Sequence, residues 1–210
     1  MHFSDRNDAA HRLAEALESY RGSSALVLAV PRGGVPVGAV VAAELGLKLD
    51  IILAKKIGHP SNSEYAIGAV TLQGIQYERD LEEVDPHYIA AETERLRKEL
   101  ERRQALFTGG RPPAVVKEKT VILVDDGIAT GSTLIAAIMG LRKSDVAKIV
   151  VAVPVAPVQA RHTFEELADE YICLHESASF SGVGQFYDDF SEVTDEDVAG
   201  YLKNIAQLNS

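Results

Sequence analysis

The stretch VILVDDGIATGST at positions 121–133 gives the strongest indication of the fold. It starts with the apolar run 121–124, continues with Asp125 and Asp126, and ends in a loop of small and hydroxyl-bearing residues. A short apolar run next to turn residues is typical of a parallel strand buried on both faces. A helical pattern follows at 131–141, so the sequence predicts a strand, a loop and a helix in succession.

The two acids and the loop suggest a joint chemical role. Two carboxylates at the carboxyl end of a strand can accept hydrogen bonds from a vicinal diol or hold Mg²⁺, directly or through water. The start of the helix offers unpaired N–H groups and a positive dipole end to a phosphate. Simple helix capping by Asp126 or Thr130 is the structural alternative. A Walker loop is excluded because no lysine follows Gly131, and the three-glycine dinucleotide pattern is absent.

Apolar strands and helices alternate on both sides of this segment. Further strands are predicted at 25–30, 49–54, 147–153 and 171–174, and helices at 5–20, 37–45, 157–168 and 195–208. This alternation predicts an α/β fold, with a mostly parallel sheet and helices on both faces. We expect one domain with its core at 25–174. An insertion at 64–113 should hold a hairpin (66–71 and 75–79), a long helix (86–107) and a linker (109–113).

Composition and charge limit the function classes. The chain has 210 residues, a net charge of −10 and one cysteine. A polyanion-binding surface needs a basic face, which argues against nucleic acid and anionic membranes as partners. One cysteine excludes a disulfide framework and fits a reducing compartment. No signal-peptide pattern is present at the start, so we expect a soluble, cytoplasmic protein. The oligomeric state stays open, a homodimer included.

Segment 121–133 closely resembles the signature of the type I phosphoribosyltransferases, in which two acids precede a loop of the form Ala-Thr-Gly-x-Thr. Together with residues 31–34 (PRGG) and 64–70 (EYAIGAV), it resembles a stand-alone bacterial subfamily of these enzymes. The resemblance implies that Asp125 and Asp126 meet the ribose hydroxyls and the Mg²⁺ shell of 5-phosphoribosyl 1-pyrophosphate (PRPP). It also implies that the loop wraps the 5-phosphate with Ala129, Thr130, Gly131, Ser132 and Thr133.

Two more segments are similar to parts of the same family. Residues 30–38 resemble its pyrophosphate loop, which implies that Arg32, Gly33 and Gly34 meet the leaving group. A strained peptide bond is common there in the family, and Arg32–Gly33 is the candidate because glycine has the least steric penalty. A basic pair follows the second strand in the family, which implies that Lys55 and Lys56 reach toward pyrophosphate. The alternatives are an ordinary helix entry and a solvated strand end.

The tail and one polar loop complete the expected site. The tail from residue 175 is similar to the hood that sandwiches the acceptor base in the family, which implies stacking on Phe186 or Tyr187. A small packing cluster with Phe180 and Phe190 is the alternative. The polar stretch 57–64 is predicted to be a mobile loop that closes over the site with His59, or else a static surface loop.

The expected function is Mg²⁺-dependent transfer of phosphoribose from PRPP to a nitrogen acceptor, a nucleobase, with release of pyrophosphate. Arg32, Lys55 and Lys56 would neutralise the leaving group together with Mg²⁺. A non-catalytic sensor of PRPP or a nucleotide, and a hydrolase of a phosphorylated sugar or nucleotide, remain alternatives. Relatives specific for hypoxanthine and guanine carry an aspartate where this chain has Ala129, so poor activity with these bases is predicted.

Overall fold

The computed structural model describes residues 1–77 and 84–208. A five-stranded parallel sheet forms the body, with strand order β2-β1-β6-β7-β8. Its strands are β1 (Leu26–Ala29), β2 (Lys48–Ile51), β6 (Thr120–Val124), β7 (Lys148–Pro157) and β8 (Glu170–Ser177). From β1 the sheet continues to β2 on one side, and from β6 it continues to β7 and β8 on the other side. The topological switch point therefore lies between β1 and β6. Loops that follow them meet at one edge.

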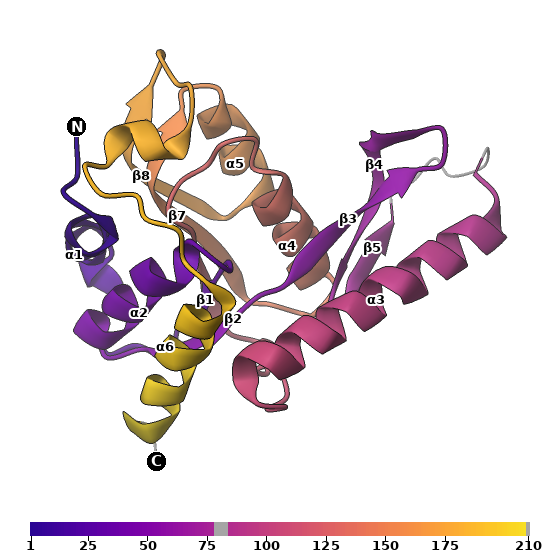
Figure 1. Ribbon diagram of the computed structural model, residues 1–210, viewed down its shortest axis with the longest axis horizontal. Coiled ribbons are helices and arrows are strands. Elements are labelled where there is room, and N and C mark those ends of the chain that lie inside the picture. The colour runs from indigo at the N-terminus through magenta and orange to yellow at the C-terminus, as the bar shows by residue number, and fades with distance from the viewer. Residues whose placement is uncertain (78–83, 209–210) are drawn as a thin grey trace.

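Helices cover both faces of this sheet (Figure 1). On β6, Ile122 and Val124 pack with α1 (Arg6–Ala16) and α2 (Gly34–Leu45), while Val121 and Leu123 pack with α4 (Ser132–Arg142) and α5 (Ala160–Leu167). Successive side chains of a strand point to opposite faces, so a wholly apolar strand needs cover on both. The predicted α/β class, with a parallel sheet and helices on both faces, is confirmed.

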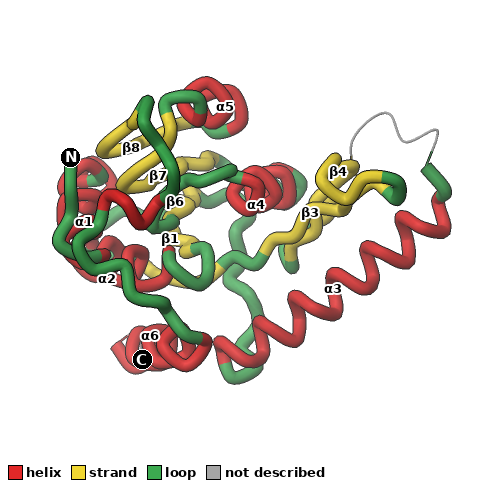
Figure 2. Tube along the Cα trace, turned by 45° about the horizontal axis from the view of Figure 1, so that its top comes forward, coloured by secondary structure: helices red, strands yellow, loops and turns green. Residues whose placement is uncertain are grey.

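A second, three-stranded sheet and a long helix form an arm that extends from the body (Figure 2). Its antiparallel strands are β3 (Ala54–His59), β4 (Asn62–Thr71) and β5 (Ile75–Tyr77), and its helix is α3 (Pro86–Thr108). The predicted hairpin of β4 and β5 is confirmed up to Tyr77. Residues 78 and 79 of the predicted second strand lie outside the described residues. The predicted long helix is also present.

The polar stretch 57–64 was predicted to be a loop, and this prediction is wrong. Residues 54–59 and 62–71 pair as an antiparallel hairpin whose register shifts near Gly58. One face of an antiparallel strand can meet water, so polar residues do not exclude a strand. The predicted second strand is also shorter, because the chain leaves β2 after Ile51 and Ala54 already belongs to β3.

The C-terminal part returns to the body. After β8 come a short 3₁₀ turn, η2 (Val183–Phe186), and the final helix α6 (Asp195–Leu208), which packs near α2 and α3. A second 3₁₀ turn, η1 (Glu18–Tyr20), follows α1. Among the described residues, no helix combines the length and the apolar character that a bilayer span requires.

Candidate functional site

The loop after β6 forms a polar hollow at the start of α4. Residues 125–134 and Val183 line a cavity of about 240 Å³. Gly131 caps α4 with φ of 73°, in the left-handed region that favours glycine. Ala129, Thr130, Ser132 and Thr133 lie around it, and the hydroxyls of Thr130 and Ser132 are 3.0 Å apart. The amides at the start of a helix and these hydroxyls can bind an anion of phosphate size.

Asp125 and Asp126 directly follow the carboxyl end of β6, and both line this hollow. The Asp126 amide donates to Asp125 Oδ1 at 2.9 Å. Burial raises the pKa of Asp125 well above its usual range, and the neighbouring Asp126 charge raises it further. Burial also raises the pKa of Asp126, while the Arg6 guanidinium opposes that rise. Two adjacent carboxyls, with Asp126 buried and Asp125 partly buried, favour a nearby cation.

The loop after β1 packs directly on these acids. A Cβ added at Gly33 would lie 2.0 Å from Asp126 Oδ2, and one at Gly34 would lie 2.9 Å from Asp125 Cα. The cis peptide bond of this loop joins Pro31 to Arg32, one bond before the Arg32–Gly33 bond that the sequence analysis named. Gly33 itself has helical φ and ψ values of −59° and −32°. Glycine is therefore required at position 33 for space and not for an unusual conformation.

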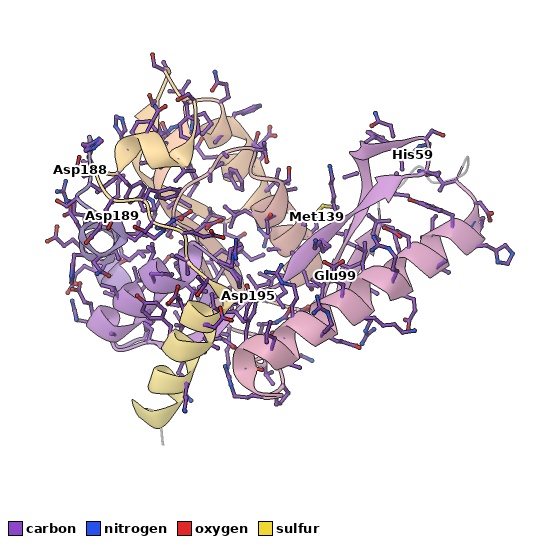
Figure 3. The ribbon with its side chains drawn as sticks, viewed as in Figure 1. His59, Glu99, Met139, Asp188, Asp189 and Asp195 are labelled. Carbon is purple, nitrogen blue, oxygen red and sulfur yellow. The ribbon has the colours of Figure 1, made fainter. Side chains whose placement is uncertain are left out.

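The predicted basic residues Arg32 and Lys55 are paired with acids from other elements. Arg32 Nη2 donates to Glu192 Oε1 at 2.8 Å, and Arg32 Nη1 lies 3.9 Å from Asp195 Oδ1 at the start of α6. Lys55 Nζ lies 3.1 Å from Glu99 Oε1. Figure 3 shows Glu99 on α3. Lys56 is the next residue of β3, so its side chain leaves the opposite face of that strand. These contacts join Arg32 to the segment that leads into α6 and join Lys55 to α3.

His59 lies at the tip of the β3–β4 hairpin, apart from the five-stranded sheet (Figure 3). Its Nδ1 accepts a hydrogen bond from the Ser61 amide at 3.1 Å, and its ring meets Tyr65 edge-on. A closing role for His59 stays a prediction.

Phe186 and Tyr187 are buried in an aromatic cluster. Phe186 lies against Phe180 with ring centroids 5.4 Å apart, and Tyr187 lies between Phe3 and Phe190 at 5.4 and 5.0 Å. The Tyr187 hydroxyl donates to the Asp126 carbonyl at 2.6 Å. Phe186 is 7% exposed and Tyr187 5%, so a base that stacks on either ring has to displace a neighbouring group. The stacking role stays a prediction.

Sequence reasoning missed Arg6, which contacts the candidate site directly. Its Nε donates to Asp126 Oδ2 at 2.8 Å, and both side chains are mostly buried. Arg6 is the first residue of α1, where the helix dipole disfavours a cation. That cost is small, and Asp5 and Asp8 lie at the same end of the helix, so no signal in the sequence points from Arg6 to Asp126.

Fold and site together define an α/β protein with adjacent acids and an anion-sized hollow at its topological switch point. The family model named "Phosphoribosyl transferase domain" matches residues 6–191. The chain belongs to this family.

Relatives agree with this assignment. The chain is 40% identical to the protein TT1426 from Thermus thermophilus, with a TM-score of 0.90 over 97% of this chain and 99% of that one. It is 37% identical over 204 residues to the Mycobacterium tuberculosis H37Rv protein named "Putative phosphoribosyl transferase", which covers 95% of this chain and 46% of that protein. The chain therefore spans about half the length of this curated relative.

A more distant solved structure agrees in fold alone. The purine phosphoribosyltransferase from Pyrococcus horikoshii Ot3 is 18% identical, with a TM-score of 0.50 over 92% of this chain and 99% of that one. The resemblance to type I phosphoribosyltransferases that the sequence analysis found is confirmed.

Proposed function

We propose that this protein binds PRPP with Mg²⁺ and transfers its phosphoribosyl group to a nitrogen acceptor, a nucleobase. One observation carries the proposal: Asp125 and Asp126 line the same hollow as the loop at the start of α4, and this hollow can hold a phosphate. The carboxylates suit the two ribose hydroxyls, and the loop suits the 5-phosphate. Membership of the phosphoribosyl transferase family supports transfer from PRPP as the general reaction.

In the proposed reaction, a nitrogen atom of the acceptor forms a bond to the anomeric carbon of ribose. The bond from that carbon to the pyrophosphate oxygen breaks, and pyrophosphate leaves with the electron pair. Asp125, Asp126 and the loop hold the ribose and its phosphate in place. Arg32, Lys55 and Lys56 neutralise the leaving group, for which Arg32 has to leave Glu192 and Lys55 has to leave Glu99.

The chemistry of the acids fits Mg²⁺. No group of three or more histidine, cysteine or acidic side chains suited to a metal occurs among residues 1–77 and 84–208. Mg²⁺ is commonly held by one or two carboxylates together with substrate phosphates, which is what Asp125 and Asp126 offer. Burial raises the pKa of both groups, so a cation beside them offsets an unfavourable charge. When bound, the ion would supply positive charge to the leaving pyrophosphate.

Calorimetry with PRPP tests the proposal. Each charge-assisted hydrogen bond contributes about 1.5–3 kcal/mol, so Asp125→Asn combined with Asp126→Asn is expected to weaken PRPP binding at least ~10-fold. Omitting Mg²⁺ is expected to weaken binding as well. Glu94→Gln combined with Glu101→Gln removes the same charge from α3 and is the matched control. Equal affinity of the Asp125/Asp126 variant and wild type would disprove the assignment.

Pyrophosphate release separates transfer from its alternatives. The proposed transferase releases pyrophosphate only when an acceptor is added. A sensor would bind PRPP and release none with any acceptor, while a hydrolase would release its product without an acceptor. Either of these two results would replace the proposed function.

The choice of base is the finer part of the proposal. Ala129 lies exposed in the phosphate loop and has no group that accepts a proton from a purine. In a panel of adenine, hypoxanthine, guanine, xanthine, uracil and orotate, we expect little pyrophosphate release with hypoxanthine or guanine. We expect Ala129→Asp to increase release with these two bases. A wild-type kcat/KM of ~10⁴ M⁻¹s⁻¹ or more with either base would contradict the prediction.

A further inference from the structure

Arg6 connects the Asp126 carboxylate to Phe190 and Ser191, two adjacent residues in the segment before α6. Its Nε donates to Asp126 Oδ2 at 2.8 Å, and its Nη1 donates to the Ser191 carbonyl at 2.8 Å. Its guanidinium carbon lies 3.9 Å from the centre of the Phe190 ring. The side chain is 13% exposed, and that of Asp126 is 12% exposed. The mostly buried Arg6 guanidinium therefore contacts the Asp126 carboxylate, the Ser191 carbonyl and the Phe190 ring at the same time.

The N-terminal segment is docked so that Arg6 reaches this place. The Phe3 amide donates to the Phe186 carbonyl at 2.8 Å, and the Asp188 amide donates to the Phe3 carbonyl at 2.9 Å. The Asp189 amide also donates to the Ser4 carbonyl at 2.9 Å. Figure 3 shows Asp188 and Asp189 close to the N-terminal end. These bonds fix the start of α1 against residues 186–189.

Asp126 is held from three directions. The Tyr187 hydroxyl donates to its carbonyl at 2.6 Å, which fixes the backbone. Gly33 lies against its carboxylate, where an added Cβ would come within 2.0 Å of Oδ2. Arg6 binds that same oxygen and so determines how the carboxylate is turned. A carboxylate that must accept from a ribose hydroxyl needs a defined rotamer, because a misplaced group loses much of its effect.

We propose that Arg6 is a positioning residue, which holds the Asp126 carboxylate in its substrate-binding orientation and couples it to Phe190 and Ser191. The proposal rests on the PRPP-binding function proposed above. A guanidinium can do this because it presents several N–H donors in a planar fork and stacks on aromatic rings. A lysine keeps the charge but presents a single ammonium centre, which cannot reach the Asp126 carboxylate and the Ser191 carbonyl with the same geometry.

The test is PRPP affinity, measured by calorimetry with Mg²⁺ on the full chain. Arg6→Met is expected to weaken binding at least ~10-fold, because the Asp126 carboxylate then loses the contact that orients it for the ribose hydroxyl. Arg6→Lys is expected to remain at least ~3-fold weaker than wild type. Arg12→Met is the matched control, because Arg12 also lies on α1, pairs with Asp8 and faces the Phe3 ring. Full rescue by lysine would overturn the proposal.

A double-mutant cycle separates positioning from a structural role. In an Asp126→Asn background, Arg6→Met is expected to change PRPP affinity by less than ~2-fold, because its partner is already neutral. The same loss in both backgrounds would show that Arg6 acts independently of Asp126 and would overturn the proposal. Thermal unfolding of each variant accompanies the binding measurement. If Arg6→Met does not fold, the proposal is tested with Arg6→Lys and with the double variant Arg6→Met/Asp126→Asn. The double variant leaves no unpaired buried charge.

The wild-type measurement distinguishes the two proposals. Wild type that binds PRPP, with unchanged affinity in Arg6→Met, overturns the role of Arg6 and leaves the proposed function intact. Wild type that does not bind PRPP overturns both.

Discussion

At the scale of single residues, the distance between the two site loops depends on the absence of a side chain at Gly33. The Asp126 carboxylate occupies the space where a side chain at Gly33 would begin, because a Cβ there would lie 2.0 Å from Oδ2. Such a contact requires the acid or the loop to shift. The loop after β1 and the loop after β6 can therefore approach each other this closely only with glycine at this position.

Gly33→Ala is expected to displace the Asp126 carboxylate and to weaken PRPP binding at least ~10-fold. In free energy, this loss lies at the lower end of the ~1–3 kcal/mol that overpacking usually costs. Gly200→Ala is the matched control, because an added Cβ there meets nothing within 4 Å and the position lies inside α6. It should leave binding unchanged and slightly raise stability. Calorimetry and thermal unfolding measure both effects, and equal PRPP affinity of Gly33→Ala and wild type would contradict the packing argument.

At the scale of elements, the segment that leads into α6 competes with the proposed substrate for Arg32. Glu192 accepts from Arg32 at 2.8 Å, and Asp195 lies 3.9 Å from the same guanidinium. The Glu192 side chain is 73% exposed and that of Arg32 is 41% exposed. An ion pair this exposed contributes about 0–1 kcal/mol, so an anionic ligand of higher charge can displace it.

Glu192→Gln is therefore expected to raise the affinity for PRPP by up to ~5-fold, because Arg32 no longer has to leave a carboxylate. Glu196→Gln makes the same change of charge at an exposed position in the first turn of α6, and Glu196 is not an ion-pair partner of Arg32. It is expected to leave affinity near the wild-type value. Parallel calorimetric titrations of the two variants at one salt concentration decide the matter. An equal gain in both would assign the effect to net charge.

The β3–β4 hairpin is the element whose nature the sequence analysis got wrong. Its residues include Lys55, Lys56 and His59, which are polar and suggested a loop. Ile57 is the buried residue of β3, and the other β3 side chains are half-buried. A strand with so little apolar content is stabilised by its neighbours β4, α3 and α4, and the two helices lie far away along the chain.

At the scale of the whole molecule, an ion pair between half-exposed Arg111 and buried Asp50 fastens the end of the arm to the body. Asp50 on the edge strand β2 has a side chain that is 1% exposed, and it accepts from Arg111 Nη2 at 2.7 Å. It also accepts from the Ala114 amide at 2.7 Å. These bonds hold the segment that returns from α3 against the five-stranded sheet, in addition to the packing of β3 and β4 on α4.

Arg111→Met leaves the Asp50 carboxylate buried without its cation and is expected to lower the free energy of unfolding by about 1.5–3 kcal/mol. Arg97→Met is the matched control, because Arg97 lies on the same arm and pairs with Glu101 at the surface. Such a pair contributes ~0.2–0.5 kcal/mol. Urea unfolding at neutral pH gives both values. A loss with Arg111→Met no larger than with Arg97→Met would show that the Arg111–Asp50 pair does not anchor the arm.

The sequence by itself determined the α/β class, the parallel strands and the position of the diacid loop. These features are local, because each depends on a run of neighbouring residues: an apolar strand, two acids, and a glycine followed by a helix. The contacts of Arg6, Glu192 and Glu99 were decided only by the tertiary structure. Their partners lie 120, 160 and 44 positions away, at Asp126, Arg32 and Lys55. Periodicity carries no information about contacts over such separations, because they form only when packing brings different elements together in space.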